Sequence, residues 1–557
     1  MKGKKKILAI IPVRGGSKGI PRKNSRLLVG KPLLSYAITT CLRSKYVDEV
    51  YVTTESPQLE EIAYKYGAKV IERSQKLSED DVALDEVVVD AVRRVEKKEK
   101  KKFDLIVSMQ ATSPLVSNKS LDNAIRECMR EGVDTVVSVV NDSHLRWSYD
   151  EGGNVVSLFT KRVNRQQLPG IFKETGGFVI CKRSVLNKKT RFGKKVSLYE
   201  VGKEEAVDID DRYDWWLAER SLLRKKICFH VIGNRKNGIG HIYRALSLAD
   251  RIMDHEIHFV VSKENDLAIK KIQSQFYDLT VCPKGKEAET ILNYEPDIVI
   301  NDILNTSPLF MKKLKAKGIP TINFEDLGEG SLFADVVINA LYDYHPYLKK
   351  EKVFHGIDYC CLRDEFLYTE PKKYSNKVNN ILILFGGTDP ENLTERTLQW
   401  LSELKGKWSI TVICGLGYPH EAKIKRIARR SSHKIKVIKD APIISKYMRE
   451  ADIAVTAAGR TLFELTSLGV PMIVIPSSKR ELSHCLVHNS FGLVSLGMWK
   501  DVSKKDFHNT VLDLINSKLL RFNMRKALLK ENVHQGIENV LSIINSVAQK
   551  VKNLRAR

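Results

Sequence analysis

The sequence predicts an α/β protein in which helices cover parallel sheets, arranged as two successive parts. Apolar runs of strand length alternate with helical segments along the chain, which is typical of parallel sheets covered by helices. A loop of glycines and cations, 14–24, follows the first expected strand. A second glycine loop, 238–240, follows a fresh strand that begins just after the basic residues 224–226. We therefore expect one domain at 1–225 and another at 227–557.

The first part has the elements of a Rossmann-like domain. Its apolar runs predict strands, in order, at 7–13, 49–53, 105–109, 135–140 and 177–181. Helices are expected between them, including 32–42 and 84–99, and the long amphipathic segment 211–223 closes the part.

The second part repeats the same alternation and is expected to have two lobes. Its predicted strands are 227–232, 257–261, 298–300, 321–324, 336–339, 381–385, 410–414, 453–456 and 472–475. The stretch 367–378 is rich in Lys, Pro, Ser and Asn, which is typical of a linker. The lobes are therefore expected at about 227–366 and 379–557. Residues 500–557 are predicted to form a helical, lysine-rich tail with no assignable chemistry.

Composition narrows the class of protein. The 557 residues are 43% hydrophobic and 29% charged, as in an ordinary soluble globular protein. No apolar run is long enough to cross a bilayer, and residues 1–6 lead into a strand without a cleavage site for a signal peptide. The nine cysteines show no Cys-x-x-Cys pair or metal-ligand spacing, so we expect reduced packing residues. These features predict a cytoplasmic protein without membrane insertion.

The formal net charge of +25 has two interpretations. It is compatible with binding to nucleic acid or to an anionic membrane surface. It is equally compatible with a lysine-rich surface and clefts that bind phosphate. The densest basic run, 97–102, has no interleaved aromatic residues for stacking bases. We therefore favour the second interpretation and expect no nucleic-acid partner.

The loop after the first strand has the composition of a phosphate-binding loop. Its glycines allow positive φ and bring backbone N–H groups close to an anion; they are Gly15, Gly16 and Gly19. Its cations supply positive charge; they are Arg14, Lys18, Arg22 and Lys23. The spacing matches neither the P-loop nor the dinucleotide fingerprint. A solvated basic turn is the alternative interpretation of this stretch.

Five collinear motifs make the first part resemble the N-acylneuraminate cytidylyltransferases over nearly all of residues 5–222. They are IPVRGGSKGIPRKN at 11–24, GKPL at 30–33, QATSP at 110–114, RQQLP at 165–169 and VDID at 207–210. The resemblance implies an α/β nucleotidyltransferase domain. It also implies a reaction that joins CTP to a nine-carbon ulosonic acid and releases pyrophosphate.

This chemistry requires phosphates held in line, neutralised charge and a metal ion. The side chains placed to bind triphosphate oxygens are Arg14, Ser17, Lys18 and Lys23, and Asn24 is placed to hydrogen-bond the base or ribose. Asp208 and Asp210 project to the same side of an expected strand and suit Mg²⁺, although an isolated Asp-x-Asp is more often a surface pair. We expect Arg14, Lys23 and Asp210 to be catalytic.

Two further motifs are expected to line the substrate site. Gln110, Thr112 and Ser113 follow a strand directly, at the position where open parallel sheets bind ligands. Arg165 and Gln166 are expected to meet the carboxylate and polyol of the acid.

The first part departs from the family pattern at two places. Thr53-Thr54-Glu55-Ser56 stands where Ser-Thr-Asp-Asp is usual, and Thr175-Gly176 stands where Asn-Gly is usual. Both changes preserve the turn while altering polar groups. The nucleotide reaction is therefore expected to be intact, whereas the identity of the acid is open.

The second part resembles UDP-sugar hydrolases of the pseudaminic-acid pathway, which are relatives of glycosyltransferases with the two-lobed glycosyltransferase-B fold. The motifs that carry the resemblance over about 227–500 are GIGHIYR at 238–244, LRDEF at 362–366, GGTDPENLT at 386–394 and AAGRTLFE at 457–464. The resemblance makes His241 the base that takes a proton from water. It implies UDP-sugar contacts from Gly238, Gly240, Arg244, Gly386, Gly387, Thr388 and Glu464.

Each of these residues also has a structural interpretation. A histidine at a helix start is commonly a cap or a packing residue, and Glu464 is also explained as a solvated helix carboxylate. Loop amides at the N-terminus of a helix can take the charge of a diphosphate, so no divalent ion is required here.

The second part departs further from its family. Asn-Phe-Glu-Asp at 323–326 stands where an Asp-rich turn is more usual, and Lys-Arg-Glu-Leu-Ser-His at 479–484 replaces an Asn-Gln motif. We favour hydrolysis, and we keep transfer of the sugar to an acceptor and a non-catalytic binding module as alternatives.

Together the two parts predict a bifunctional enzyme that makes a CMP-activated, pseudaminic-like acid. Its expected small-molecule partners are CTP with Mg²⁺, a nonulosonic acid and a UDP-sugar. The two reactions are not consecutive in that synthesis, so the fusion implies co-regulation more than direct channelling. We also expect a homodimer formed through the N-terminal domain.

Overall fold

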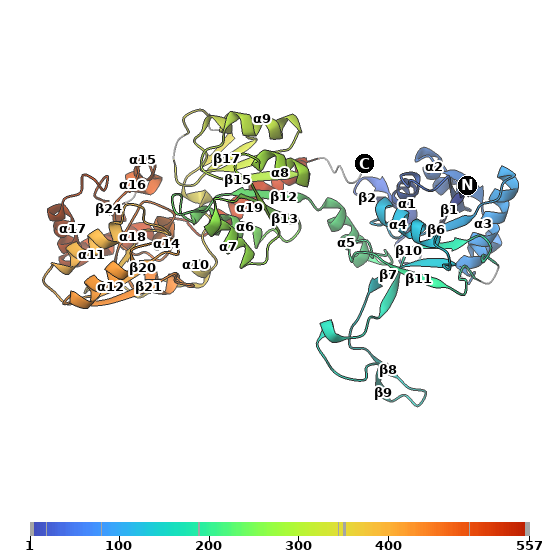
Figure 1. Ribbon diagram of the computed structural model, residues 1–557, viewed down its shortest axis with the longest axis horizontal. Coiled ribbons are helices and arrows are strands. Elements are labelled where there is room, and N and C mark those ends of the chain that lie inside the picture. Colours follow the sequence, from blue (N-terminus) through green and yellow to red (C-terminus); the bar gives the residue numbers. More distant parts are fainter. Residues whose placement is uncertain are drawn as a thin grey trace. The chain divides into compact units, whose positions relative to one another are not determined.

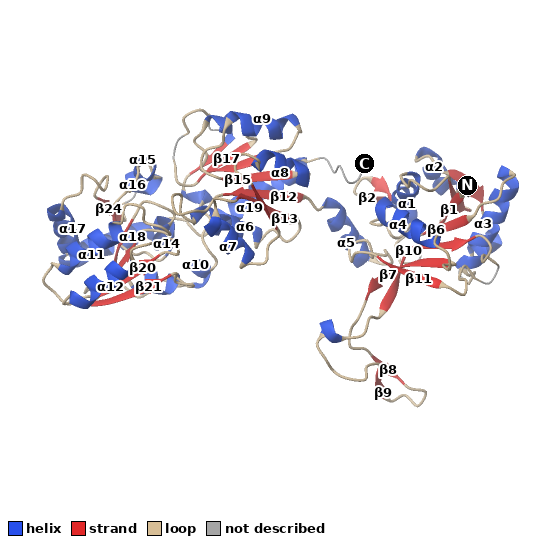
Figure 2. Ribbon diagram, viewed as in Figure 1, coloured by secondary structure: helices blue, strands red, loops and turns tan. Residues whose placement is uncertain are grey.

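A computed structural model describes residues 5–17, 19–79, 81–187, 190–342, 345–348, 352–489 and 491–551. The chain divides into two compact α/β units, Met1–Leu223 and Arg224–Lys552, and we describe each by itself (Figures 1 and 2). This division places the boundary next to residues 224–226, where the sequence predicts it.

The first unit is built on a seven-stranded sheet in the order β11-β7-β10-β6-β1-β4-β5. The strands are β1 (Ile7–Pro12), β4 (Glu49–Thr54), β5 (Lys69–Glu72), β6 (Leu105–Met109), β7 (Thr135–Asn141), β10 (Phe172–Lys182) and β11 (Val196–Glu200). Strand β10 runs antiparallel to β6 and β7, while the other pairs are parallel. The sheet is therefore mostly parallel, with one reversed strand.

Helices cover both faces of this sheet. They are α1 (Leu33–Leu42), α2 (Pro57–Lys65), α3 (Leu84–Glu99), α4 (Asn118–Cys128) and α5 (Arg212–Leu223). Alternate residues of β1 point to opposite faces. Ile7, Ala9 and Ile11 pack with α1, α2 and α4, whereas Leu8 and Ile10 pack with α3. The unbroken apolar run of β1 follows from this burial on both faces.

An arm projects from the ends of β7 and β10 (Figure 1). It contains the short hairpin β8 (Trp147–Tyr149) and β9 (Val155–Ser157) and a turn of 3₁₀ helix, η3 (Arg165–Gln167). Large apolar side chains on the hairpin are exposed, including Trp147 at 57% and Tyr149 at 73%. The sequence analysis did not predict this arm.

The first lobe of the second unit has a fully parallel seven-stranded sheet in the order β14-β13-β12-β15-β16-β17-β18. The strands are β12 (Lys226–Val231), β13 (Glu256–Ser262), β14 (Leu279–Cys282), β15 (Ile298–Asp302), β16 (Thr321–Phe324), β17 (Val336–Asn339) and β18 (Val353–His355). The helices that follow its strands include α6 (Gly240–Ala249), α7 (Asp266–Gln273), α8 (Glu287–Tyr294) and α9 (Pro308–Ala316).

The second lobe has a parallel six-stranded sheet in the order β21-β20-β19-β22-β23-β24. The strands are β19 (Asn380–Leu384), β20 (Ser409–Cys414), β21 (Lys434–Lys439), β22 (Ile453–Thr456), β23 (Met472–Val474) and β24 (Leu493–Ser495). The helices are α10 (Glu365–Tyr368), α11 (Leu393–Ser402), α12 (Glu421–Arg430), α13 (Ser445–Glu450), α14 (Thr461–Ser467), α15 (Lys479–Leu482), α16 (Cys485–Asn489), α17 (Lys504–Asn516) and α18 (Lys518–Leu528).

The last helix, α19 (Gly536–Lys550), does not belong to the second lobe. Its residues Ile537, Val540 and Ile544 are buried in the core of the first lobe, together with Ile227 and Phe229 of β12. The expected lobe boundary of 379–557 is therefore wrong at its end, because the chain returns to the first lobe after α18. The helical tail predicted from the sequence has a structural role in that lobe.

Two general predictions can be compared with the described residues. All nine cysteines are buried, and none of them forms a disulfide in the structure. Within the described residues, no helix is both long and apolar enough to cross a membrane.

Candidate functional site

The glycine loops lie where each sheet reverses its strand order. Ligands of open α/β sheets bind outside the carboxyl ends of the strands at such a switch point. The loop after β1 lies between β4 and β6, the loop after β12 lies between β13 and β15, and the loop after β19 lies between β20 and β22. The three glycine loops thus lie at the carboxyl edge of their sheets.

In the first unit, side chains tether the glycine loop to the neighbouring strands. Asn24 donates through Nδ2 to the carbonyl of Arg14 at 3.1 Å, and the Gly15 N–H donates to Oε1 of Glu55 at 2.6 Å. The buried guanidinium of Arg73 donates to the carbonyls of Val13 and Thr53, both at 2.8 Å. Burial lowers the pKa of Arg73. The sequence analysis missed Arg73, which holds the start of the loop in place.

Lys23 joins the glycine loop to the Val-Asp-Ile-Asp motif. Its Nζ donates to the carbonyl of Ile209 at 2.5 Å and pairs with Oδ1 of Asp210 at 3.3 Å. A Cβ placed on Gly19 would lie 2.2 Å from the carbonyl oxygen of Asp210, so only glycine allows this approach. The N–H of Ile209 in turn donates to the carbonyl of Thr112 at 2.8 Å. Three motifs far apart in the sequence therefore meet at one crevice.

Asp208 lies deeper in the same crevice than Asp210. Its Oδ1 is buried without a hydrogen-bond partner, and a Cβ on Gly176, whose φ is +69°, would lie 2.6 Å from its Oδ2. Burial raises the pKa of Asp208; Asp210 adds to the rise, and Thr112 and Lys23 oppose it. The side chain of Asp210 is 79% exposed. The pair lies in a loop between β11 and α5, so the prediction that both project from a strand is wrong.

This carboxylate pair fits a hard cation that keeps most of its ligands outside the protein. Oδ1 of Asp208, Oγ1 of Thr112 and Oδ1 of Asn24 are buried without a hydrogen bond of good geometry, although Thr112 lies close enough to Asp208 to lower its pKa. No group of three or more His, Cys, Asp or Glu side chains in the described residues has the arrangement of a metal site. Mg²⁺ typically uses one or two carboxylates together with substrate phosphates, so both observations are compatible with it.

The remaining predicted residues of the first unit have different positions. No atom lies within 4 Å of a Cβ built on Gly16, so this part of the loop is open. The Gln110 N–H donates to Gly177 at 3.1 Å, and the Ser113 hydroxyl donates to the Thr175 carbonyl at 3.3 Å. Both bonds fix the motif after β6 against β10. Lys18 lies outside the described residues.

Arg165 and Gln166 lie on η3 in the projecting arm. The structure does not place them at the sheet edge that carries the glycine loop (Figure 1). Their contacts with the acid remain a prediction, because η3 is not packed beside the glycine loop in the single chain.

In the second unit, His241 lies in the first turn of α6, directly after the glycine loop. Its Nδ1 lies 2.5 Å from Oδ1 of Asp302, the last residue of β15. The side chain of His241 is 11% exposed, whereas that of Asp302 is 1% exposed. The histidine thus stands at the boundary between the cleft and a buried carboxylate that the sequence analysis missed.

Arg244, one turn further along α6, is turned into the protein. Its Nε and a terminal nitrogen donate to the two carboxylate oxygens of Asp302 at 2.7 and 2.6 Å, and its other terminal nitrogen donates to Glu325 at 2.7 Å. Burial would lower the pKa of Arg244, but Asp302 and Glu325 outweigh it and raise the pKa. Burial would raise the pKa of Asp302, but Arg244 and His241 hold it well below its ordinary value. Arg244 is therefore occupied by carboxylates, although the sequence analysis expected it to contact the UDP-sugar.

The two glycine loops of the second unit lie against each other where the lobes meet. A Cβ on Gly387 would lie 2.7 Å from Cγ1 of Ile239, and one on Gly238 would lie 3.9 Å from Oγ1 of Thr388. Gly386 has a φ of +73°, which favours glycine. The buried carboxylate of Asp389 accepts bonds from the N–H groups of Leu393 and Thr394 and so fixes this loop to the start of α11.

Arg460 is a second functional candidate that the sequence analysis missed. It precedes α14 and donates to the Cys361 carbonyl at 2.6 Å, while its other terminal nitrogen is buried without a partner. Its Cδ would lie 3.4 Å from a Cβ on Gly240. Burial lowers the pKa of Arg460, and the neighbouring Arg244 adds to this effect. The crevice therefore contains an unsatisfied cation next to the His241 loop, as an anionic ligand requires.

Glu464 lies on α14, and its Oε1 accepts from Nε of Arg363 at 2.9 Å. The carboxylate is thus half of an ion pair and not simply a solvated helix side chain. Its predicted contact with ribose hydroxyls remains a prediction.

The altered motif at 479–484 connects the two lobes. Arg480 donates through Nε to the hydroxyl of Tyr342 at 2.7 Å and through a terminal nitrogen to Oδ1 of Asn305 at 2.8 Å. Its third bond goes to the carbonyl of Glu325, next to the carboxylate network. The departure from the family pattern at this position therefore supplies an interlobe contact.

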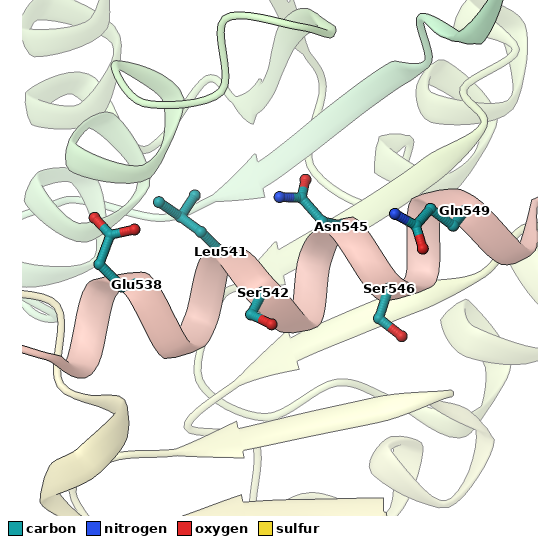
Figure 3. A pocket seen from close by; sticks show the side chains of 6 residues that line it. All are labelled: Glu538, Leu541, Ser542, Asn545, Ser546 and Gln549. Carbon is teal, nitrogen blue, oxygen red and sulfur yellow. The ribbon is translucent and has the colours of Figure 1, made fainter.

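A shallow hollow elsewhere in the second unit has none of these features. It runs along the exposed face of α19, and Figure 3 shows the six side chains that line it: Glu538, Leu541, Ser542, Asn545, Ser546 and Gln549. They all come from one helix, and none of them was predicted as a site residue.

Comparison with known proteins agrees with this geometry. Residues 8–207 match the family described as Cytidylyltransferase, and residues 380–540 match the Glycosyltransferase family 28 C-terminal domain. The CMP-N,N'-diacetyllegionaminic acid synthase of Legionella pneumophila is 32% identical over 226 residues, covering 39% of this chain and 96% of that protein. The chain belongs to the cytidylyltransferase family. This confirms the resemblance of the first unit.

Two other relatives show how far the similarity extends along this cytidylyltransferase. The pseudaminic acid cytidylyltransferase and UDP-2,4-diacetamido-2,4,6-trideoxy-beta-L-altropyranose hydrolase of Helicobacter pylori is 23% identical over 521 residues, covering 90% of this chain and 94% of that protein. N-acylneuraminate cytidylyltransferase A of Danio rerio is 34% identical over 224 residues, covering 39% of this chain. The chain spans only 51% of that fish protein, about half its length.

Proposed function

We propose that the protein is a bifunctional enzyme of nonulosonic acid biosynthesis. Its first unit transfers CMP from CTP to a pseudaminic-like nine-carbon acid, and its second unit hydrolyses a UDP-diacetamido-trideoxyhexose to the free sugar and UDP. The observation that carries the first activity is the meeting of Lys23, Asp208, Asp210 and Thr112 at the switch point of the sheet. The similarity to the two-activity protein of Helicobacter pylori supports the pairing.

In the first unit, a hydroxyl oxygen of the acid attacks the α-phosphorus of CTP and loses its proton to solvent, and pyrophosphate leaves with the electrons of the broken P–O bond. Little covalent assistance is needed, so the protein acts by positioning and by neutralising charge. Arg14 and Lys23 are placed on the loop that would hold the phosphates. Asp208 and Asp210 would hold Mg²⁺, which supplies further neutralisation of the phosphate charge when bound. Lys23 exchanges its bond to Asp210 for phosphate oxygens when the nucleotide binds.

In the second unit, water attacks the anomeric carbon of the sugar and its proton passes to His241. The bond between that carbon and the diphosphate oxygen breaks, and UDP leaves with its electron pair. The backbone amides at 238–240 and 386–388 and the unsatisfied guanidinium of Arg460 are placed to stabilise the diphosphate charge.

A sugar hydroxyl could take the place of water at the same site, which would make the second unit a glycosyltransferase. The match of residues 380–540 to a glycosyltransferase domain favours this second candidate. Release of free sugar without any acceptor would count against it. A non-catalytic binding module is excluded if UDP release depends on His241.

One experiment on the whole chain tests both activities. Pyrophosphate release is measured with CTP, Mg²⁺ and a panel of nine-carbon acids, and UDP release is measured with a panel of UDP-diacetamido-trideoxyhexoses. Asp210→Ala should abolish pyrophosphate release and keep UDP release, while His241→Ala should do the reverse. Each variant is thus the folding control for the other. Pyrophosphate release that stays at background with every acid of the panel would reject the first activity. Unchanged UDP release in His241→Ala would reject the second mechanism.

A homodimer through the first unit remains part of the proposal. Exposed apolar side chains on the arm, such as Trp147 and Tyr149, support it because they would be covered in an interface. Sedimentation of the whole chain measures the oligomeric state.

A further inference from the structure

We infer that Asp302 is a positioning residue that fixes the tautomer of His241 and leaves Nε2 of the ring as the proton acceptor. This inference rests on the proposed hydrolysis by the second unit. It starts from the distance of 2.5 Å between Nδ1 of His241 and Oδ1 of Asp302.

The direction of this hydrogen bond follows from the other partners of Asp302. Both of its oxygens already accept from the guanidinium of Arg244, at 2.7 Å for Oδ2 and 2.6 Å for Oδ1. A carboxylate held in this way is ionised and can only accept hydrogen bonds. The proton of the contact must therefore lie on Nδ1 of His241. In the neutral ring Nε2 then has a free lone pair, which is the state that a general base needs.

The network also fixes the position of Asp302 itself. Arg244 is 3% exposed, packs over the ring of Phe324 at 4.6 Å from its centroid, and is held on its far side by Glu325. His241 and Arg244 are three residues apart on α6 and so lie on the same face of the helix. One turn of helix thus carries both the base and the cation that anchors its partner, which leaves the ring little freedom to rotate.

The charges of this network match the reaction. The buried carboxylate of Asp302 contacts both the guanidinium of Arg244 and the ring of His241. When Nε2 takes the proton of the attacking water, the imidazolium that forms is ion-paired with this carboxylate. The electron pair of the broken O–H bond forms the new bond to the anomeric carbon, and UDP leaves with the pair of the old one.

Histidine tautomers can be read directly by ¹⁵N NMR of the whole chain labelled at histidine. The chain has 13 histidines, and loss of one signal set in His241→Gln assigns the residue. We expect a protonated Nδ1 and a bare Nε2 for His241 in the wild type. This measurement needs neither substrate nor a variant of Asp302, so it tests the inference even if that variant fails to fold.

Asp302→Asn tests the same point by changing one atom. The new NH₂ group must face either His241 or a donor of Arg244, so one of the fixed contacts is lost in either orientation. We expect the single tautomer to be lost and kcat for UDP release to fall by about 100-fold, the range of general-base effects, with KM changed much less. Asp326→Asn is the matched control, because Asp326 is an equally buried carboxylate next to Glu325 that binds Thr306 and Asn323 instead. It should keep the His241 tautomer.

The outcomes separate this inference from the proposed function. A bare Nδ1 on His241 in the wild type, or a kcat within about threefold of the wild type in Asp302→Asn, would overturn the role of Asp302. The expected tautomer in a wild-type protein that releases UDP from no UDP-sugar would instead overturn the proposed hydrolysis.

Discussion

In the first unit, the two residues that depart from the family pattern, Glu55 and Thr175, both have defined hydrogen-bond partners. Glu55, which departs from the family pattern, accepts a bond from the Gly15 N–H through Oε1 and one from the Ser78 hydroxyl through Oε2 at 3.1 Å. Its side chain therefore reaches the glycine loop after β1. Thr175, the other departure, is buried against Ser138, with 2.9 Å between the two hydroxyl oxygens. Both replacements thus have defined partners, and the one at Glu55 contacts the loop proposed to bind CTP.

The raised pKa of Asp208 predicts the pH dependence of the first activity. Because burial raises it, the carboxyl stays protonated to a higher pH than an ordinary aspartic acid, and the protonated form does not bind Mg²⁺. We expect Mg²⁺-dependent pyrophosphate release to fall about tenfold for each pH unit below that raised pKa. Release is measured against pH at several Mg²⁺ concentrations.

Asp208→Asn should remove this activity and also change stability. The raised pKa means that the folded state binds the proton more tightly than the unfolded state does. The free energy of unfolding of the wild type therefore declines as the pH rises through the pKa of the folded state, and Asp208→Asn loses this dependence. Asp150→Asn, at an exposed turn of the arm, is the control and should keep the activity; because backbone and side-chain hydrogen bonds from Asn154 lower the pKa of Asp150, its effect on the pH dependence of stability has the opposite sign. A pH profile identical in wild type and Asp208→Asn would contradict the prediction.

At the scale of elements, the central strands could be predicted and the edge strands could not. Strands such as β1 and β22 are buried on both faces, so they read as unbroken apolar runs. Edge strands are exposed, and β21 (Lys434–Lys439) alternates Lys with apolar residues. The glycine loops could be predicted because a backbone that turns back and exposes several N–H groups needs glycines at several neighbouring positions, which leaves a pattern in the sequence. Asp302 was not found, because a lone charged residue at the end of a strand leaves no such pattern, whereas Arg460 lies within the motif at 457–464 but was given no role.

The helix α19 was predicted as a helix without a role, since its amphipathic pattern does not say which lobe it packs on. Ile544 of α19 is fully buried in the first lobe. Ile544→Ala should lower the free energy of unfolding of the second unit by about 2–5 kcal/mol, because it leaves a cavity in that core. Ser542→Ala, on the face of α19 drawn in Figure 3, should change it by less than about 0.5 kcal/mol. Denaturant titration of UDP release measures both, with pyrophosphate release as an internal reference. Equal losses in the two variants would contradict the packing of α19 on the first lobe.

Over the whole second unit, Arg480 is the side chain that links the lobes most directly to the carboxylate network. It comes from α15 of the second lobe and contacts Asn305, Glu325 and Tyr342 of the first. We expect these bonds to favour this arrangement of the lobes when no ligand is bound. Less of the binding free energy would then be spent on bringing the lobes together.

Arg480→Ala removes these bonds and should raise KM for the UDP-sugar by about tenfold, since only part of the protein would then be in the closed arrangement. The kcat should change less, because Asp302 and His241 remain in contact. Lys479→Ala, at the exposed neighbour, is the control and should keep the wild-type KM. Steady-state kinetics of UDP release provide the measurement, and an unchanged KM in Arg480→Ala would show that the lobes do not depend on this contact.

The return of α19 to the first lobe also affects biosynthesis. The strands of that lobe are translated before the second lobe, yet Ile537, Val540 and Ile544, which complete its core, follow the second lobe in the chain. Domains usually fold in the order in which they are translated. Here the second lobe can fold completely first, while the apolar surface of the first lobe on which α19 packs is still exposed. A chain interrupted between α18 and α19 would thus carry a complete second lobe and a first lobe with exposed apolar core residues, which chaperones and proteases recognise.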